Sequence, residues 1–147
     1  MVFPGYFLLG MLCFLAAQIS FIQAFTFEPF KGRIGLFISI LLTLVLTQLL
    51  PNIDDIGLKL GFPVYAAFLG TMGWRALARF DQGFIESLSG IGGLLFMISD
   101  GCIGVNMFYY KLSRAQEIIM STYYLAQFLI TLSAVKVIDL EKREKGK

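Results

Sequence analysis

One carboxylic acid lies deep inside a long apolar stretch of the chain. Asp100 is near the middle of the run Ile85–Tyr109, directly after Ser99. An ionisable side chain at membrane depth costs at least about 2.5–3.5 kcal/mol to insert, so its presence there indicates a function. Away from water the protonated acid is favoured over the carboxylate, and a neutral acid is what general acid catalysis requires. The alternative is a carboxyl group that only holds a neighbouring helix by a hydrogen bond.

The residues at helical spacing around this acid are small. One face of the predicted helix carries Glu86, Gly90, Gly93, Met97, Asp100 and Gly104. Such a narrow face lets a neighbouring helix or a lipid chain approach the carboxyl group closely.

The last apolar run supplies polar groups that could surround this acid. Tyr123, Tyr124 and Gln127 lie within Ile118–Ile138, and we expect Gln127 at about the depth of Asp100 in an antiparallel neighbour. An amide and a phenol can orient a carboxyl group or a water molecule. The alternative for adjacent tyrosines is packing or an interfacial aromatic belt.

Four further residues are candidate substrate contacts. Ser99 precedes the acid, and Asn106 lies about two helical turns beyond it on a different face. Arg75, beside Trp74, could bind a phosphate headgroup through its guanidinium. The alternative for that pair is a helix end anchored at the interface by an aromatic ring and a cation.

The composition is that of a membrane protein. Hydrophobic residues make up 57% of the 147 residues and charged residues 15%, whereas soluble domains are roughly 25% charged. The charges fall in short clusters between long uncharged runs. So little polar surface could not cover a soluble domain.

Several chemistries are excluded by residue types. The chain has no histidine, and its two cysteines, Cys13 and Cys102, stand alone in apolar runs. We therefore expect no catalytic triad, no metalloprotease site, no Cys-X-X-Cys zinc site and no disulfide framework. With a net charge of +2 and no basic stripe, no nucleic-acid partner is expected.

The sequence predicts an all-α polytopic transmembrane bundle over residues 1–138. A span needs about 20 mostly apolar residues, and five runs come close: 3–25, 34–50, 62–77, 85–109 and 118–138. Residues 139–147 form a charged tail. With five spans, nine of the twelve Lys and Arg residues fall on the side of the C-terminus, which predicts that this end is cytosolic.

Two C-terminal segments resemble a known family when they occur together. The run Phe96–Asp100 (FMISD) with Asn106, followed by Ile119–Gln127 (IMSTYYLAQ), is very similar to the signature of the lysoplasmalogenase family, also called YhhN-type or transmembrane protein 86-like proteins. Met72–Ala76 (MGWRA) looks like the block before that signature, and 7–25 resembles the family's middle span. The resemblance covers essentially the whole chain.

This resemblance implies a membrane hydrolase of the endoplasmic reticulum. Animal members cleave the vinyl ether bond of lysoplasmalogens, which are lysophospholipids, to a fatty aldehyde and glycerophosphoethanolamine or glycerophosphocholine. By resemblance, Asp100 is the acid, and Tyr123, Tyr124 and Gln127 are its shell. The resemblance also implies that no cofactor, neither a metal nor a nucleotide, is required.

Two departures from the family keep other hypotheses open. Family members typically have about eight spans, with a Gly-Asp motif in the third, and this chain corresponds to a C-terminal portion without that motif. It also has Gln18 where many animal members have histidine. The alternatives are an inactive truncated protein that acts as a lipid-binding or regulatory partner, or a small transporter.

Overall fold

Five long helices account for most of the chain. The computed structural model describes residues 4–25 and 27–145, and within these ranges it contains helices and no strands. The α-helices are α1 (Pro4–Phe25), α2 (Gly32–Leu49), α3 (Ile56–Ala78), α4 (Phe84–Phe108) and α5 (Ala115–Lys145), and a short 3₁₀ helix, η1 (Leu50–Asn52), follows α2. All five α-helices are long and apolar enough to cross a membrane. The predicted all-α transmembrane bundle is confirmed.

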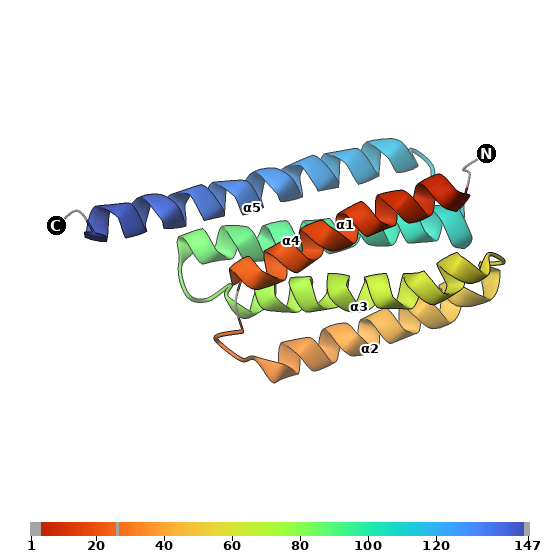
Figure 1. Ribbon diagram of the computed structural model, residues 1–147, viewed down its shortest axis with the longest axis horizontal. Coiled ribbons are helices and arrows are strands. Elements are labelled where there is room, and N and C mark those ends of the chain that lie inside the picture. Colours follow the sequence, from red (N-terminus) through yellow and green to blue (C-terminus); the bar gives the residue numbers. More distant parts are fainter. Residues whose placement is uncertain (1–3, 26, 146–147) are drawn as a thin grey trace.

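Helix α3 is central to the bundle. It packs against α1, α2 and α4, while α5 packs chiefly against α4. Figure 1 shows the helices running side by side along one direction, with α5 extending beyond the others towards the C-terminus. The short connections between successive helices make each one antiparallel to the next, as is usual in helical membrane bundles.

Two helices are longer than the predicted spans. Helix α3 begins at Ile56 rather than near residue 62, because Asp55 caps it by accepting a hydrogen bond from the Leu58 N–H at 2.8 Å. The helix then continues through Pro63. Helix α5 continues through the charged residues from 139 to Lys145, because Glu and Lys are good helix formers that need no apolar partner.

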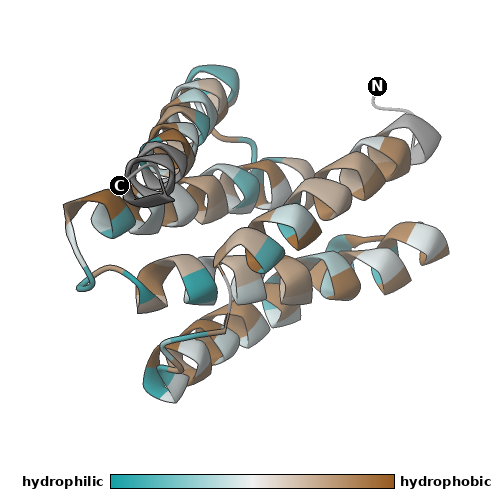
Figure 2. Cartoon of the chain, turned by 60° about the vertical axis from the view of Figure 1, so that its left-hand side comes forward, coloured by the Kyte–Doolittle hydropathy of each residue, from teal (hydrophilic) through white to brown (hydrophobic). Residues whose placement is uncertain are grey.

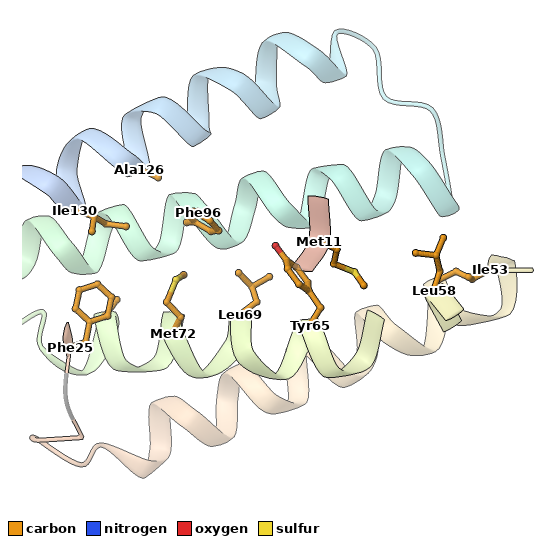
Figure 3. Packing of buried hydrophobic residues seen from close by; sticks show 11 residues of the cluster. Met11, Phe25, Ile53, Leu58, Tyr65, Leu69, Met72, Phe96, Ala126 and Ile130 are labelled. Atoms are coloured by element: carbon orange, nitrogen blue, oxygen red, sulfur yellow. The ribbon is translucent and has the colours of Figure 1, made fainter. Parts of the chain in front are cut away.

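Apolar side chains lie both inside and outside the bundle. The buried cluster follows the seam between α3 and α4 and includes Leu69, Met72 and Phe96 (Figure 3). Large hydrophobic side chains such as Leu36, Phe37 and Phe128 are exposed on outer faces. Figure 2 shows hydrophobic residues along every helix. An outer surface of this kind suits hydrocarbon rather than water.

Glycines allow α4 to approach both of its neighbours. A Cβ atom on Gly93 would lie 2.5 Å from the Ala76 Cβ on α3, and one on Gly92 would lie 3.0 Å from the Ala126 carbonyl oxygen on α5. The small face predicted around Asp100 is therefore the face that packs against α3. Close backbone approach of this kind is typical of membrane helix interfaces.

We expect Gly93→Ala to destabilise the bundle and Gly101→Ala to leave it intact. The added methyl of Gly93→Ala collides with Ala76, which has no flexible end to move away, whereas a Cβ on Gly101 would have no atom within 4 Å. Overpacking of this kind costs about 1–3 kcal/mol. Unfolding in detergent measures both variants, and equal stability of the two would contradict the described helix packing.

Candidate active site

The carboxyl group of Asp100 faces a phenol on the central helix. Asp100 is 9% exposed, and the Tyr65 hydroxyl donates a hydrogen bond to its Oδ2. Figure 3 shows Tyr65 pointing from α3 towards α4. Among the described residues, no Lys or Arg forms an ion pair with this acid. One carboxyl oxygen is thus held by a neutral donor.

The register of α3 against α4 brings these two side chains together. Gly93 lies against Ala76, and Gly104 lies so close to Phe62 that a Cβ atom on the glycine would be 3.1 Å from the ring. In an antiparallel pair, these two contacts place Tyr65 opposite Asp100. The site therefore depends on the small residues of α4, since any larger side chain there would push α3 away.

Two apolar cavities meet at this acid. The first has a volume of about 180 Å³ and lies between α1, α3 and α4, lined on α1 by Gly10, Met11 and Phe14. The second has a volume of about 260 Å³ and lies between α2, α3 and α4. Both are lined by Phe62, Tyr65, Asp100 and Gly104. The acid can consequently be approached from either side of the α3–α4 seam.

The second cavity is long and almost entirely apolar. It follows α2 from Leu41 to Leu49 and α4 from Leu94 to Gly104. Ten residues of α-helix cover about 15 Å, so the cavity has the length of a substantial part of a fatty chain. Asp100 and Tyr65 lie towards one end of it.

Of the predicted partners on α5, only Tyr123 lies close to the site. Its ring contacts Phe96 and Phe14, with centroids 5.8 Å and 5.7 Å apart, and Phe96 is one helical turn from Asp100. Tyr124 is 62% exposed on the outer face of α5. The second tyrosine of the pair is therefore directed away from the acid.

Gln127 lies at another depth than expected. The Ser99 hydroxyl donates to the Ile119 carbonyl oxygen at 3.0 Å, and Gly92 lies against Ala126. This register places the turn around Ile119, not Gln127, opposite Asp100. Gln127 is about two helical turns away, near Gly92, because close packing of Gly92 on Ala126 sets the depth of α5.

Ser99 and Asn106 have hydrogen-bond partners within the fold. Ser99 is 1% exposed and holds α5 through the bond to Ile119. The Asn106 Oδ1 accepts a hydrogen bond from the Leu112 N–H at 3.0 Å, which orders the connection between α4 and α5. Both polar side chains therefore have a structural role, since each forms a hydrogen bond that holds neighbouring parts of the fold together.

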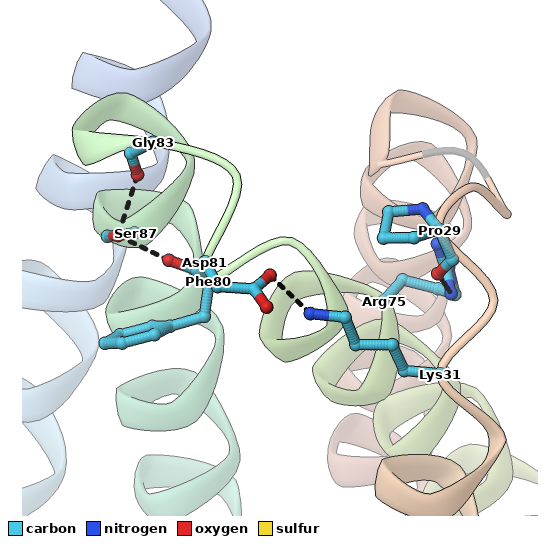
Figure 4. A network of polar contacts seen from close by, with 7 residues as sticks. All are labelled: Pro29, Lys31, Arg75, Phe80, Asp81, Gly83 and Ser87. Atoms are coloured by element: carbon cyan, nitrogen blue, oxygen red, sulfur yellow. Dashed lines mark hydrogen bonds and ion pairs between the residues drawn. The ribbon is translucent and has the colours of Figure 1, made fainter.

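Trp74 and Arg75 hold the connection between α1 and α2. The Trp74 Nε1–H donates to the Lys31 carbonyl oxygen at 2.9 Å. The Arg75 Nη1–H donates to the Pro29 carbonyl oxygen at 3.1 Å (Figure 4). Arg75 is fully buried, and its guanidinium lies 5.4 Å from the Phe27 ring centroid. Ten residues separate it from Tyr65 on α3, about 15 Å. Neither residue lies at the acid.

An ion pair links two connections at this same end of the bundle. The Lys31 ammonium donates to the Asp81 carboxylate, which lowers the pKa of Asp81 below its ordinary value. Because the pKa is lowered, the ion pair stabilises the fold at pH values above about 3.9, the ordinary pKa of an aspartate in the unfolded chain. This stabilisation is lost as the pH falls further and the carboxylate is protonated. Both side chains remain partly or largely exposed, so solvent screens the pair.

The residue pattern along single helices does not identify Tyr65 as a partner of Asp100. The sequence nevertheless contains a signal for it, in the distances of the two residues from the connection between α3 and α4. The connection between α3 and α4 is short, so residues at similar distances from it must lie at similar depth. Tyr65 and Asp100 lie about equally far from residues 79–83 on opposite arms of this hairpin. The register between α3 and α4, rather than that between α4 and α5, therefore identifies the partner of the acid.

These features define a class, a polytopic helical membrane protein with an acid enclosed between apolar cavities. The chain belongs to the YhhN family, whose sequence profile matches residues 2–134. Over 137 residues it is 39% identical to the protein named Lysoplasmalogenase TMEM86A of Bos taurus and 38% identical to that of Homo sapiens. It is 37% identical over 140 residues to Lysoplasmalogenase TMEM86B of Homo sapiens.

These matches cover 90–92% of this chain and 57% of each of the three relatives. The chain therefore spans under two thirds of the length of the curated relatives it matches. No solved structure shows a significant match to it.

Proposed function

We propose that this chain hydrolyses the vinyl ether bond of lysoplasmalogens, releasing a fatty aldehyde and glycerophosphoethanolamine or glycerophosphocholine. The observation that carries the proposal is the position of Asp100, bonded to Tyr65 and bordered by two apolar cavities. The names of the relatives support the same reaction. The proposed surroundings are the membrane of the endoplasmic reticulum, with the C-terminus in the cytosol, as the distribution of Lys and Arg suggests.

The reaction begins with proton transfer from Asp100 to carbon. Its carboxyl proton goes to the alkenyl carbon distant from the ether oxygen, and the π electrons of the C=C bond form the new C–H bond. The ether oxygen shares its lone pair with the adjacent carbon, so an oxocarbenium ion results. A buried acid without a cationic partner stays neutral until this step.

Water completes the cleavage without a further reagent. Its oxygen bonds to the oxocarbenium carbon, and one of its protons returns to the Asp100 carboxylate, which restores the acid. The hemiacetal then loses its bond to the glycerol oxygen, and its hydroxyl proton moves to that oxygen. One water is consumed, and the fatty aldehyde and glycerophosphoethanolamine or glycerophosphocholine are released.

Tyr65 has two tasks in this sequence. By donating to Oδ2 it fixes the orientation of the carboxyl group in the ground state. After proton transfer the same bond stabilises the carboxylate, because hydrogen bonds to a charged acceptor are stronger than those to a neutral one. The fold supplies no cation for this purpose among the residues described near Asp100.

The proposed reaction is tested with paired substrates in membranes that contain the chain. A 1-alkenyl lysophospholipid should yield fatty aldehyde, whereas the 1-alkyl analogue with the same chain and headgroup should yield none, because it has no alkenyl carbon to protonate. Membranes without the chain provide the background. If aldehyde release from the alkenyl substrate does not exceed that background, the proposed function is wrong.

The long α2-side cavity is the proposed binding place of the alkenyl chain. Gly101 lines this cavity and Gly10 lines the α1-side cavity, and a Cβ on either glycine would have no atom within 4 Å. Gly101→Leu should therefore fill the chain site without disturbing the fold. KM for long-chain substrates should rise about tenfold, because the leucine side chain displaces 1–2 methylenes of the substrate from the cavity. Gly10→Leu is the matched variant on the other side and should leave KM unchanged. A larger rise in KM for Gly10→Leu would assign the chain to the α1 side.

A further inference from the structure

Gln18 on α1 is a buried amide with unfilled hydrogen-bonding capacity. Its side chain is fully buried, and among the described residues neither Oε1 nor Nε2 forms a hydrogen bond of good geometry; the amide interacts only with the nearby Tyr65 hydroxyl. A primary amide offers two donors and an acceptor. Burying these groups without well-formed hydrogen bonds is costly, and buried polar groups of this kind are commonly satisfied by an ordered water.

Neighbouring aromatic residues show where this amide points. Phe14 and Phe21 lie one helical turn before and after Gln18, and their rings contact that of Phe96 with centroids 6.1 Å and 6.2 Å apart. Gln18 therefore lies at the depth of Phe96, which is one helical turn from Asp100 on α4. It lies beside the hydroxyl of Tyr65, the same group that bonds Asp100.

We propose that the side-chain amide of Gln18 holds the hydrolytic water next to Asp100 on the α1 side of the site. This inference rests on the proposed function for its chemical meaning. Gln18 is a fully buried polar side chain of α1 beside the Tyr65 hydroxyl, which bonds the acid, whereas the lining that α2 gives to the other cavity is apolar. The site thereby separates its two reactants, with the fatty chain on one side of the α3–α4 seam and water on the other.

The amide acts on the second half of the reaction as a positioning residue. Its Oε1 accepts a hydrogen bond from the water, which directs the water's lone pair towards the oxocarbenium carbon. The remaining O–H of the water is left for the Asp100 carboxylate, which takes that proton as the C–O bond forms. No other reactant is needed.

The first test detects the water in the resting protein and needs no turnover. The chain is labelled with ¹⁵N-glutamine, placed in lipid bilayers, and studied by solid-state NMR with magnetisation transferred from water to side-chain amides. We expect a water cross-peak to an amide that disappears in Gln18→Leu. If the Gln18 amide receives no magnetisation from water, the inference is overturned.

Gln23 provides the matched control in the same helix. Gln23→Leu makes the same chemical change at an exposed position that is not directed into the site, so the Gln18 cross-peak should persist. Loss of that cross-peak in Gln23→Leu would mean that it reports on general hydration of α1, and this too would overturn the inference.

The second test measures which nucleophile captures the oxocarbenium ion. With methanol added, capture by water gives aldehyde and capture by methanol gives a mixed methyl acetal. Gln18→Leu should lower aldehyde release about tenfold or more and raise the acetal share of product, while Gln23→Leu changes neither. A rise in KM with an unchanged product ratio would instead assign Gln18 to substrate binding and overturn the inference. A wild-type chain that makes neither product refutes the proposed function, and the NMR result still decides whether Gln18 holds water.

Discussion

Replacing Asp100 by asparagine is expected to reduce aldehyde release by about 10²–10⁴-fold, the usual contribution of a general acid. Asparagine has nearly the same shape, and its amide oxygen can still accept the hydrogen bond that Tyr65 donates to Asp100. It has no proton acidic enough for transfer to carbon. The fold should therefore survive while the first chemical step is lost.

The control for this variant is Asp54→Asn in the exposed connection between α2 and α3. It makes the same chemical change outside the bundle and should leave the rate unchanged. Both variants are compared by aldehyde release in membranes with equal amounts of folded protein. Activity of Asp100→Asn within a few-fold of wild type would rule out Asp100 as the acid.

Tyr65→Phe is expected to have the second largest effect, a fall in kcat of about 10–10²-fold. The change removes one hydroxyl and keeps the ring that packs in the core. A hydrogen bond to a charged group contributes about 1.5–3 kcal/mol, and about 1.36 kcal/mol corresponds to a factor of ten in rate. Most of that contribution develops after proton transfer, so kcat should change more than KM.

Tyr109→Phe is the matched control, because Tyr109 is 63% exposed at the end of α4. It should leave kcat and KM unaltered. A kcat of Tyr65→Phe equal to that of the control would show that the phenol plays no part in the reaction, even though it bonds the acid.

The helices and the buried acid could be predicted because each depends on local information. Length and hydropathy identify a span without reference to its neighbours, and spacing along one helix places Asp100 on a face of glycines. Gly93 and Gly104 on that face do lie against α3. The start of α3 is harder to place, since it depends on a single cap by Asp55 ahead of the apolar run.

The partners of the acid depend on register between helices, which no single helix specifies. The sequence predicts Gln127 opposite Asp100, but packing of Gly92 on Ala126 shifts α5 by about two turns. Tyr65 takes that place from the preceding hairpin. The depth of one helix against another follows from which small residues touch, and this becomes visible only when both helices are present.

Arg75 illustrates another limit of residue types. A guanidinium near a membrane surface suits a phosphate group, and the same chemistry suits a backbone carbonyl in a turn. Here the Pro29 carbonyl oxygen accepts a hydrogen bond from it, and the Phe27 ring lies over it. Its role in the fold could not be inferred without the path of the connection between α1 and α2.

Every chemical step proposed for this chain requires that Asp100 is protonated and neutral in its apolar site before the substrate reacts. Infrared spectroscopy of the chain in lipid bilayers at neutral pH, with and without ¹³C-aspartate, measures this directly. We predict a carbonyl band of a protonated carboxylic acid that shifts with the label and is absent in Asp100→Asn. A spectrum in which Asp100 contributes carboxylate bands alone would contradict the proposed role of this acid.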